Sequence, residues 1–174
     1  QLLLSQAESL AGRFNQAAER LDDLSASLNT ALSADVTAAN TLLASIASLN
    51  DRIAHAEFSG GVANDLRDTR EQKLEELAQL VNIETGTATN GSVSISIGGA
   101  ELVTGRDVLD TLETYDAGGG QLLVRTSTAG TPLSLTGGTM QGRIDARDGA
   151  LKNLRDDLDS LASALIAEIN QIHS

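Results

Sequence analysis

In the stretch "ANDLRDTREQKLEELAQLVNIE", residues 63–84, a helical pattern gives way to a strand pattern. Its leucines recur at helical spacing, which predicts an amphipathic helix of about 17 residues. We expect Asn64 or Asp65 to cap this helix, with Asp65 and Asp68 favouring the positive end of its dipole. From Ile83 onward apolar and polar residues alternate, as in a half-buried strand.

Upstream of this stretch, apolar residues recur in steps of three and four, the spacing of a helix packed along another helix. Neither Pro nor Gly stands between Phe14 and Phe58. We therefore expect one helix from the start of the chain to about residue 57, with residues 29–35 as a candidate break because strong helix formers are sparse there. The stripe comprises Leu10, Phe14, Ala17, Leu21, Leu24, Leu28, Leu32, Val36, Ala39, Leu43, Ile46 and Ile53.

Downstream, several short runs have strand character. Asn90-Gly91 is a hairpin-turn signal in front of the alternating run "VSISIGG". Gly137-Gly138 then precedes a renewed helical period that continues to the end of the chain. The further strand-like runs are "AELVTG", "DTLETYDA", "QLLVRTST" and "PLSL", and the apolar positions of the last helix are Met140, Ile144, Leu151, Leu154, Leu158, Leu161, Leu165, Ile169 and Ile172.

These patterns predict an α+β fold. Helical stripes at both ends of the sequence can bury against each other, with the strands between them. We expect an elongated antiparallel bundle of a long, a short and a long helix, with a small, mainly antiparallel β domain inserted between the second and third. The predicted domains are a helical rod domain, residues 1–82 and 138–174, and an inserted β domain, residues 83–137.

Composition argues against several classes of partner. The 24 acidic and 12 basic side chains give a formal charge of −12, which repels nucleic acid phosphates and anionic membrane surfaces. Aromatic residues make up 2 % of the chain, so base stacking is poorly supported. No apolar run approaches the roughly 18 residues of a membrane span, and no classical signal peptide opens the chain. We expect neither nucleic-acid binding nor membrane insertion.

Candidate catalytic and metal-binding residues are few. Cysteine is absent, and neither His55 nor His173 has a second His or Cys at ligand spacing. Nucleophile, phosphate-binding and dinucleotide motifs are missing from the sequence. We therefore expect no enzyme, no cofactor and no metal site. Arg67 and Arg70, on one side of the predicted short helix, are expected to pair with carboxylates of a neighbouring helix or of a neighbouring subunit, and Arg67 can also meet Glu71 at i, i+4.

Two segments resemble a known family. "SLNDRI", Ser48 to Ile53, at the end of a long helix, and "NDLRDTREQKLEELAQLVNIE" are similar to flagellar hook-associated protein 1, where an L-N-x-x-I helix end precedes an N-D-L-x-D-x-R-D segment. "GGTMQGRIDARDGALKNLRDDLDSLASALIAEIN", residues 137–170, resembles the Gly-preceded helix of that family, while residues 83–136 match only in character. The family-motif and packing candidates are Asn64, Asp65, Leu66, Arg67, Asp68 and Arg70, and Glu71 replaces the second Asp of the motif.

The resemblance implies a structural role at the junction between flagellar hook and filament, exerted through subunit packing. It implies partners that include copies of the same chain, neighbouring hook and filament junction proteins, and an export chaperone for the full-length protein. It also implies an extracellular place in the flagellum, type III export, and a central fragment that lacks the terminal polymerisation segments. The alternatives are another axial protein, such as the second junction protein or a flagellin, and a helical-stalk binding or adhesion module.

Overall fold

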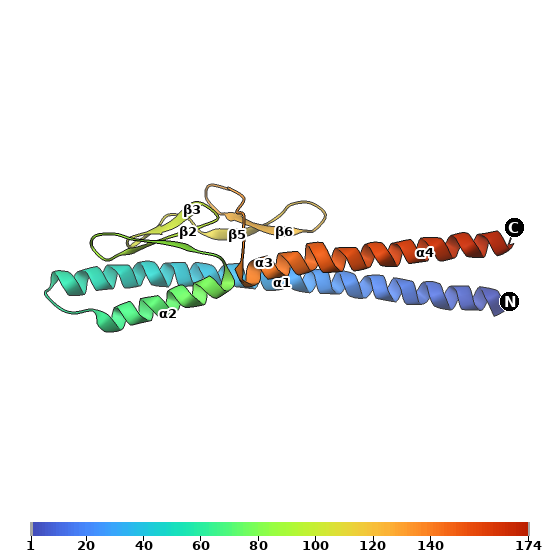
Figure 1. The fold of residues 1–174 in the computed structure, drawn as a ribbon, viewed down its shortest axis with the longest axis horizontal. Helices are drawn as coiled ribbons and strands as arrows, with labels where there is room; N and C mark the ends of the chain where they lie inside the picture. Colours follow the sequence, from blue (N-terminus) through green and yellow to red (C-terminus); the bar gives the residue numbers. More distant parts are fainter. Residues whose placement is uncertain (1, 174) are drawn as a thin grey trace. The chain divides into compact units, whose positions relative to one another are not determined.

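The structure is a computed structural model that describes residues 2–173, and the side chains of residue 6 and of residues 8–171. The chain divides into two compact units. We call residues 31–144 the mixed unit, and the residues up to 30 and from 145 onward the helix-pair unit. The elements, drawn in Figure 1, are α1 (Leu2–Phe58), α2 (Asn64–Leu80), β1 (Glu84–Thr87), β2 (Val93–Ile97), β3 (Ala100–Thr104), β4 (Asp107–Val108), β5 (Leu112–Asp116), β6 (Leu122–Thr126), α3 (Gly138–Asp145), the π-helix η1 (Ala146–Leu151) and α4 (Lys152–His173).

The order of helices and strands confirms the predicted α+β fold, with a long, a short and a long helical segment and the strands between the second and the third. Helix α1 continues without a break through residues 29–35. Contacts from the last helical segment support this weak stretch, because Arg147 donates to Asn29 at 2.5 Å and Arg143 Nε lies 2.6 Å from Asp35. The candidate break was therefore wrong.

The strands of the mixed unit form two small antiparallel sheets. One has four strands in the order β1-β2-β3-β4, and the other pairs β5 with β6. The predicted hairpin turn at Asn90-Gly91 joins β1 to β2. The run "PLSL" forms no strand and makes only an isolated bridge between Pro132 and Arg125, whereas β4 was not predicted. Figure 1 shows the strands and α2 beside the second half of α1.

One continuous core holds the mixed unit together. The α1 stripe from Leu32 to Ile46 is buried there, together with one face of α2 and the inward residues of β2. Strand β2 alternates between buried and half-buried residues, as its sequence predicted. The division into a rod domain and an inserted domain stays a prediction. The buried members are Leu32, Val36, Ala39, Leu43, Ile46, Ala47, Leu74, Leu77, Val81, Val93, Ile95, Ile97, Leu102, Val103, Leu112, Val124 and Met140.

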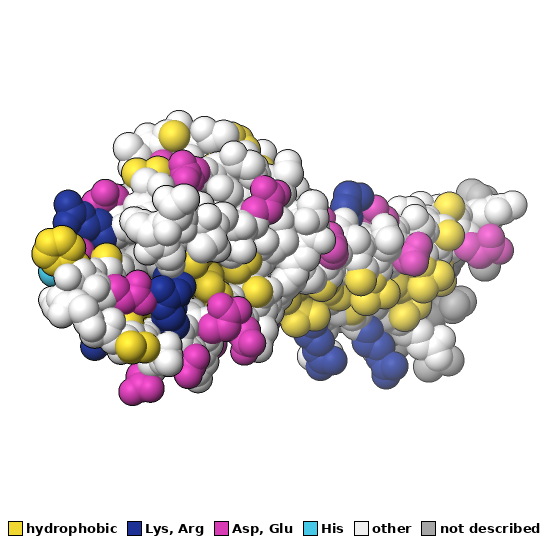
Figure 2. Space-filling view, turned by 60° about the vertical axis from the view of Figure 1, so that its left-hand side comes forward, with side chains coloured by type: hydrophobic (Ala, Val, Ile, Leu, Met, Phe, Trp, Pro, Cys, Tyr) yellow, Lys and Arg dark blue, Asp and Glu magenta, His cyan; other side chains and the backbone are white. Residues whose placement is uncertain are grey.

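In the helix-pair unit, α4 runs antiparallel to the first part of α1 (Figure 1). Arg155 of α4 donates a hydrogen bond to the Asp22 carboxylate of α1. A groove nearer the chain ends is lined by Phe14 from α1 and Leu165 from α4. Two helices leave much apolar surface exposed, as the hydrophobic side chains on the right of Figure 2 show. The most exposed are Leu24, Leu154, Leu161 and Ile166.

A π-helical segment interrupts the third predicted helix between α3 and α4. A π-helix adds a residue to the local turn and so rotates the face that follows. Leu158, Leu165 and Ile169 are half-buried, whereas Leu154 and Leu161, which belong to the same predicted stripe, are 54 % and 59 % exposed. The predicted stripe was therefore wrong at Leu154 and Leu161. The side chain of His173 lies outside the described residues.

One helix passes a composition test for a membrane span. Within Glu8–Phe58 an 18-residue window reaches a mean hydropathy of 1.2, and 39 % of that window is buried inside the protein. The signal is weak, because the core helix of a soluble protein has the same properties, and α1 supplies much of the core of the mixed unit. The absence of membrane insertion stays a prediction.

Gly138, at the start of α3, provides a test of this packing. Its φ is 81°, and a Cβ built there would lie 2.6 Å from the main-chain carbonyl of Leu80. We expect Gly138→Ala to lower the free energy of unfolding by about 2–3 kcal/mol, because it adds backbone strain and a clash. The measurement is urea unfolding followed by circular dichroism. The control Gly142→Ala, on the same helix with nothing within 4 Å of its Cβ, should be neutral or stabilise by up to about 1 kcal/mol.

Asp110 provides a pH-dependent test of the β5–β6 region. Its carboxylate accepts main-chain N–H groups of Thr128, Ala129 and Thr111 at 2.8, 3.0 and 2.7 Å. The bond from Thr128, followed by those from Ala129 and Thr111, lowers the pKa of Asp110 from 3.8 to about 2. Because the folded pKa is the lower one, this stabilisation is present above pH 3.8 and is lost as the pH falls toward 2.

We therefore expect Asp110→Asn to lower the melting temperature at pH 7, and the difference from the parent to shrink as the pH falls through this window. Thermal unfolding across the pH range measures it. A difference that stays constant down to pH 2 would contradict a role for the ionised carboxylate.

Candidate functional site

The most densely bonded group of polar side chains in the mixed unit surrounds Asn50, which is 2 % exposed. Its Nδ2 donates to the carbonyls of Val93 and Gly105 at 2.8 and 2.6 Å. Its Oδ1 accepts from the Val93 N–H at 3.1 Å and from Arg70 Nη1 at 2.8 Å. One amide thus joins α1 to α2, to the start of β2 and to the turn between β3 and β4. We call Asn50, Arg70, Gly91, Val93 and Gly105 the Asn50 node.

Arg70 is the charged member of this node. It is 7 % exposed, and its Nη1 also donates to the carbonyl of Gly91 at 2.9 Å. Burial lowers its pKa, and the positive charge of Arg67 lowers it further, while Glu71 and Glu57 oppose the change. The Arg70 Nε is buried without a hydrogen-bond partner. The prediction of a carboxylate partner was wrong for Arg70, because its bonds go to an amide and a main-chain carbonyl inside the fold.

Arg67 lies one turn before Arg70 and is half-buried. Its Nε and Nη2 donate to Glu57 Oε1 at 2.9 and 2.6 Å. The prediction of a carboxylate on a neighbouring helix is confirmed, whereas the pairing with Glu71 was wrong. Because Glu57 lies at the end of α1, this ion pair also links the two helices across the turn that joins them.

The other motif residues lie on the first two turns of α2. Asn64, Asp65 and Asp68 are exposed, and Leu66 is half-buried. The predicted cap was wrong, because the helix starts one residue earlier than expected: Ala63 is the N-cap, and no side chain bonds there. Ala63 is buried, and alanine has no side-chain oxygen that could accept from the first N–H groups of the helix. Asp65 does lie in the first turn, where its charge favours the helix dipole.

Asn40 repeats the bonding of Asn50 further back along α1. Its Nδ2 donates to the carbonyl of Leu112, and its Oδ1 accepts the Leu112 N–H, both at 2.8 Å. Leu112 begins β5, as Val93 begins β2. Two asparagines of one helix therefore each pair with both main-chain groups of the first residue of a strand. Sequence reasoning missed both roles. The available signal was an asparagine, a poor helix former, at inward positions of a long helix.

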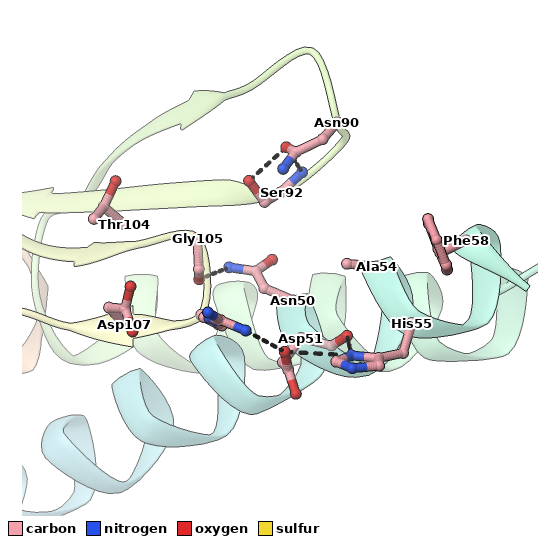
Figure 3. Close-up of a pocket in the computed structure, with 11 residues that line it drawn as sticks. Asn50, Asp51, Ala54, His55, Phe58, Asn90, Ser92, Thr104, Gly105 and Asp107 are labelled. Carbon is pink, nitrogen blue, oxygen red and sulfur yellow. Dashed lines mark hydrogen bonds and ion pairs between the residues drawn. The ribbon is translucent and has the colours of Figure 1, made fainter.

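Beside the Asn50 node lies an open hollow of about 460 Å³ (Figure 3). Its lining comes from the last turns of α1, the β1–β2 turn and the β3–β4 turn. The Asp51 carboxylate lies 3.4 Å from His55 Nδ1 and 3.9 Å from Arg106 Nη1, so one acidic side chain of the lining faces two basic residues. The lining residues thus come both from α1 and from the turns of the four-stranded sheet.

Exposed apolar side chains stand at the rim of this hollow and in the turn beyond it. Phe58 is 95 % exposed, and Val62 is 82 % exposed. Figure 3 shows Phe58 at the end of α1, beyond Ala54 and His55. Among the described residues, no group of three His, Asp or Glu side chains could hold a metal ion.

Substitution of the two arginines tests the node. Arg70→Ala should lower the free energy of unfolding by about 2–4 kcal/mol, because it leaves the Gly91 carbonyl unpaired and opens space in a buried site. The matched control Arg67→Ala removes an ion pair at the surface and should cost about 1 kcal/mol or less. Urea unfolding of both variants measures the difference. Equal decreases in the free energy of unfolding would show that Arg70 contributes no more to stability than a surface arginine.

The chain matches known proteins in sequence. The family model described as "Flagellar hook-associated protein FlgK helical domain" matches residues 1–174. The chain is 30 % identical over 183 residues to flagellar hook-associated protein 1 of Escherichia coli strain K12, covering 99 % of this chain and 34 % of that protein. It is 27 % identical over 190 residues to the protein of the same name from Salmonella typhimurium, covering 100 % of this chain and 33 % of that protein. The chain thus spans about a third of the length of these curated relatives.

A solved structure shares the fold. The flagellar hook junction protein FlgK from Burkholderia pseudomallei matches with a TM-score of 0.74 and 28 % identity, over 82 % of this chain and 27 % of that one. The family match favours the hook-associated protein 1 resemblance over the second junction protein and the flagellins. The chain belongs to the flagellar hook-associated protein FlgK helical domain family.

Proposed function

We propose that this chain is part of a structural protein of the bacterial flagellum, an adaptor at the hook–filament junction that acts through packing between subunits. The observation that carries the proposal is the family match over residues 1–174. The relatives are named as flagellar hook-associated proteins, and the related solved structure as a flagellar hook junction protein. Their names describe structural proteins, which supports a role without catalysis.

The hydrogen bonds inside the mixed unit support a structural role. The Asn50 node and the Asn40 pair fasten both sheets of the mixed unit to α1, and Arg143 fastens α3 to the same helix. Such bonds hold the elements in one arrangement, as a spacer between neighbouring subunits requires. The side-chain amide groups of Asn50 are bonded within the fold, which leaves them poorly placed to act on a substrate.

The partners and the location follow from this role as further parts of the proposal. The partners are copies of the same protein, the neighbouring hook and filament junction proteins and an export chaperone, and the location is the extracellular hook–filament junction after type III export. We also propose that residues 83–137 are a β insert in a helical domain formed by 1–82 and 138–174. The segment from Asn64 to Arg70 is proposed as the packing motif of that domain, supported by the buried bonds of Arg70 and the Arg67–Glu57 pair.

Phe58 and Val62 are the proposed contact residues for a neighbouring subunit. Burial of such exposed apolar side chains against another surface is favourable, because it removes apolar area from water. They lie next to the motif but take no part in the buried core of the mixed unit, so their replacement can be separated from unfolding.

Genetic replacement in the source bacterium tests the proposal. Deletion of the gene should leave cells with hooks that carry no filaments, seen by electron microscopy, and restoring the parent gene should restore filaments and swimming. The double variant Phe58→Ser, Val62→Ser in the full-length protein should keep the parent melting temperature but restore filaments poorly, because it removes apolar contact area.

The control is Leu109→Ser, the same kind of change at a residue that is 49 % exposed elsewhere in the mixed unit. It should restore filaments like the parent. A deletion strain with normal filaments would contradict the junction role. If the deletion strain lacks filaments and the double variant restores them fully, the junction role stands and Phe58 and Val62 are not the contact.

A further inference from the structure

We propose that Asn90 is a self-modifying residue, whose side-chain amide is lost by spontaneous deamidation with the assistance of Ser92. Asn90-Gly91 is the single Asn-Gly pair in the 174 residues. It occupies the exposed turn between β1 and β2, directly above the Asn50 node. The inference rests on this turn alone and does not depend on the flagellar role.

The reacting side chain lies in a tight turn in which Asn90 is exposed and Gly91 is half-buried. The Gly91 N–H donates to the Ala88 carbonyl at 2.8 Å, and the Ala88 N–H donates to the Ser92 carbonyl at 2.9 Å, which closes the hairpin. Gly91 has a φ of 75° and no side chain, so nothing on the next residue obstructs the approach of its nitrogen to the Asn90 side chain. The hydrogen bond from the half-buried Gly91 N–H to the Ala88 carbonyl has to open for the reaction to begin.

The reaction needs only water. The Gly91 main-chain nitrogen loses its proton to hydroxide and attacks Asn90 Cγ, forming a carbon–nitrogen bond and placing negative charge on Oδ1. The Cγ–Nδ2 bond then breaks, and Nδ2 leaves with a proton from water as ammonia, leaving a five-membered succinimide. Hydrolysis at Cγ gives aspartate, and hydrolysis at the main-chain carbonyl gives isoaspartate. The balance is asparagine plus water to aspartate or isoaspartate plus ammonia.

Ser92 is positioned to stabilise the charged intermediate. Its main-chain N–H and its hydroxyl both donate to Asn90 Oδ1, at 3.1 and 2.7 Å. This is the oxygen on which negative charge develops, so the two donors act in the manner of an oxyanion hole. Arg67 adds positive charge nearby, because its Nη2 lies 3.0 Å from a Cβ built on Gly91.

The isoaspartate product would disturb the Asn50 node. In isoaspartate the main chain runs through Cβ and Cγ, which inserts one carbon atom between residue 90 and Gly91. Gly91 is tightly placed, since its carbonyl accepts from the buried Arg70 at 2.9 Å. A shift of that carbonyl removes one of the two hydrogen bonds that Arg70 Nη1 donates, while the bond to the Asn50 amide oxygen remains. Modification of an exposed turn therefore weakens a buried contact.

The test follows deamidation of the purified chain at pH 8 and 37 °C, with Asn90 conversion measured by peptide mapping and mass spectrometry. In the folded protein Ser92→Ala should slow conversion about five-fold, equivalent to roughly 1 kcal/mol of barrier. Ser92→Thr, which keeps the hydroxyl, should convert at the parent rate. In guanidinium, where the turn is absent, all three chains should convert at the same rate.

Two outcomes would overturn the assistance by Ser92. One is equal rates for the parent and Ser92→Ala in the folded state, and the other is an equal slowing of Ser92→Ala in guanidinium. A folded parent in which Asn90 stays intact while the unfolded chain converts would overturn the modification site itself.

The effect on the node has a separate readout. Deamidated protein, separated from the parent by anion exchange and shown by peptide mapping to carry isoaspartate at residue 90, should melt at a lower temperature than the unmodified protein. The encoded variant Asn90→Asp carries the same added charge without the extra carbon atom and should retain the parent melting temperature. An equal decrease in melting temperature in both proteins would show that the added charge causes the effect. It would contradict the disturbance of the Arg70–Gly91 bond.

Discussion

The side-chain amide of Asn50 is the interaction on which the arrangement of the mixed unit depends. It satisfies both main-chain groups of Val93, the carbonyl of Gly105 and a guanidinium nitrogen of Arg70. Each of these groups is buried or half-buried. Removing such a polar group from water without giving it a hydrogen-bond partner would destabilise the fold. The amide thereby sets the positions of β2, of the β3–β4 turn and of α2 relative to the turn of α1 that carries Asn50.

The same device occurs at Asn40, which pairs with both main-chain groups of Leu112. A helix cannot extend a sheet, because its own main-chain groups are bonded within the helix. An asparagine side chain carries an NH2 group that donates and a carbonyl oxygen that accepts, in the geometry of a peptide group, and so it can bond both main-chain groups of a strand residue as a neighbouring strand would. Two such residues let small sheets, which are marginally stable alone, begin their strands against a helix. Apolar burial around Ile95, Ile97 and Leu77 supplies the driving force, while the amides fix the register.

The helix-pair unit follows a different principle. Its contacts are a few polar bonds, such as Arg147 to Asn29 and Arg155 to Asp22, with an apolar groove between the helices. Leu154 and Leu161 are exposed on α4, which follows the π-helical segment, whereas Leu158 and Leu165 of the same helix are half-buried. The periodicity of the sequence could not reveal this, since Met140 to Leu165 fits a regular pattern of threes and fours equally well.

The sequence by itself determined the long first helix, the short second one, the hairpin at Asn90-Gly91 and the apolar faces that become the core. These features depend on periodicity, on turn chemistry and on the absence of Gly and Pro, all of which act within a few residues. It also carried the motifs that place the chain in its family. Only the tertiary structure decided the partners of Arg67 and Arg70, the roles of Asn40 and Asn50 and the absence of a side-chain cap at α2. Those outcomes join residues 10 to 72 positions apart, and such pairings depend on which buried polar groups meet once the elements have packed.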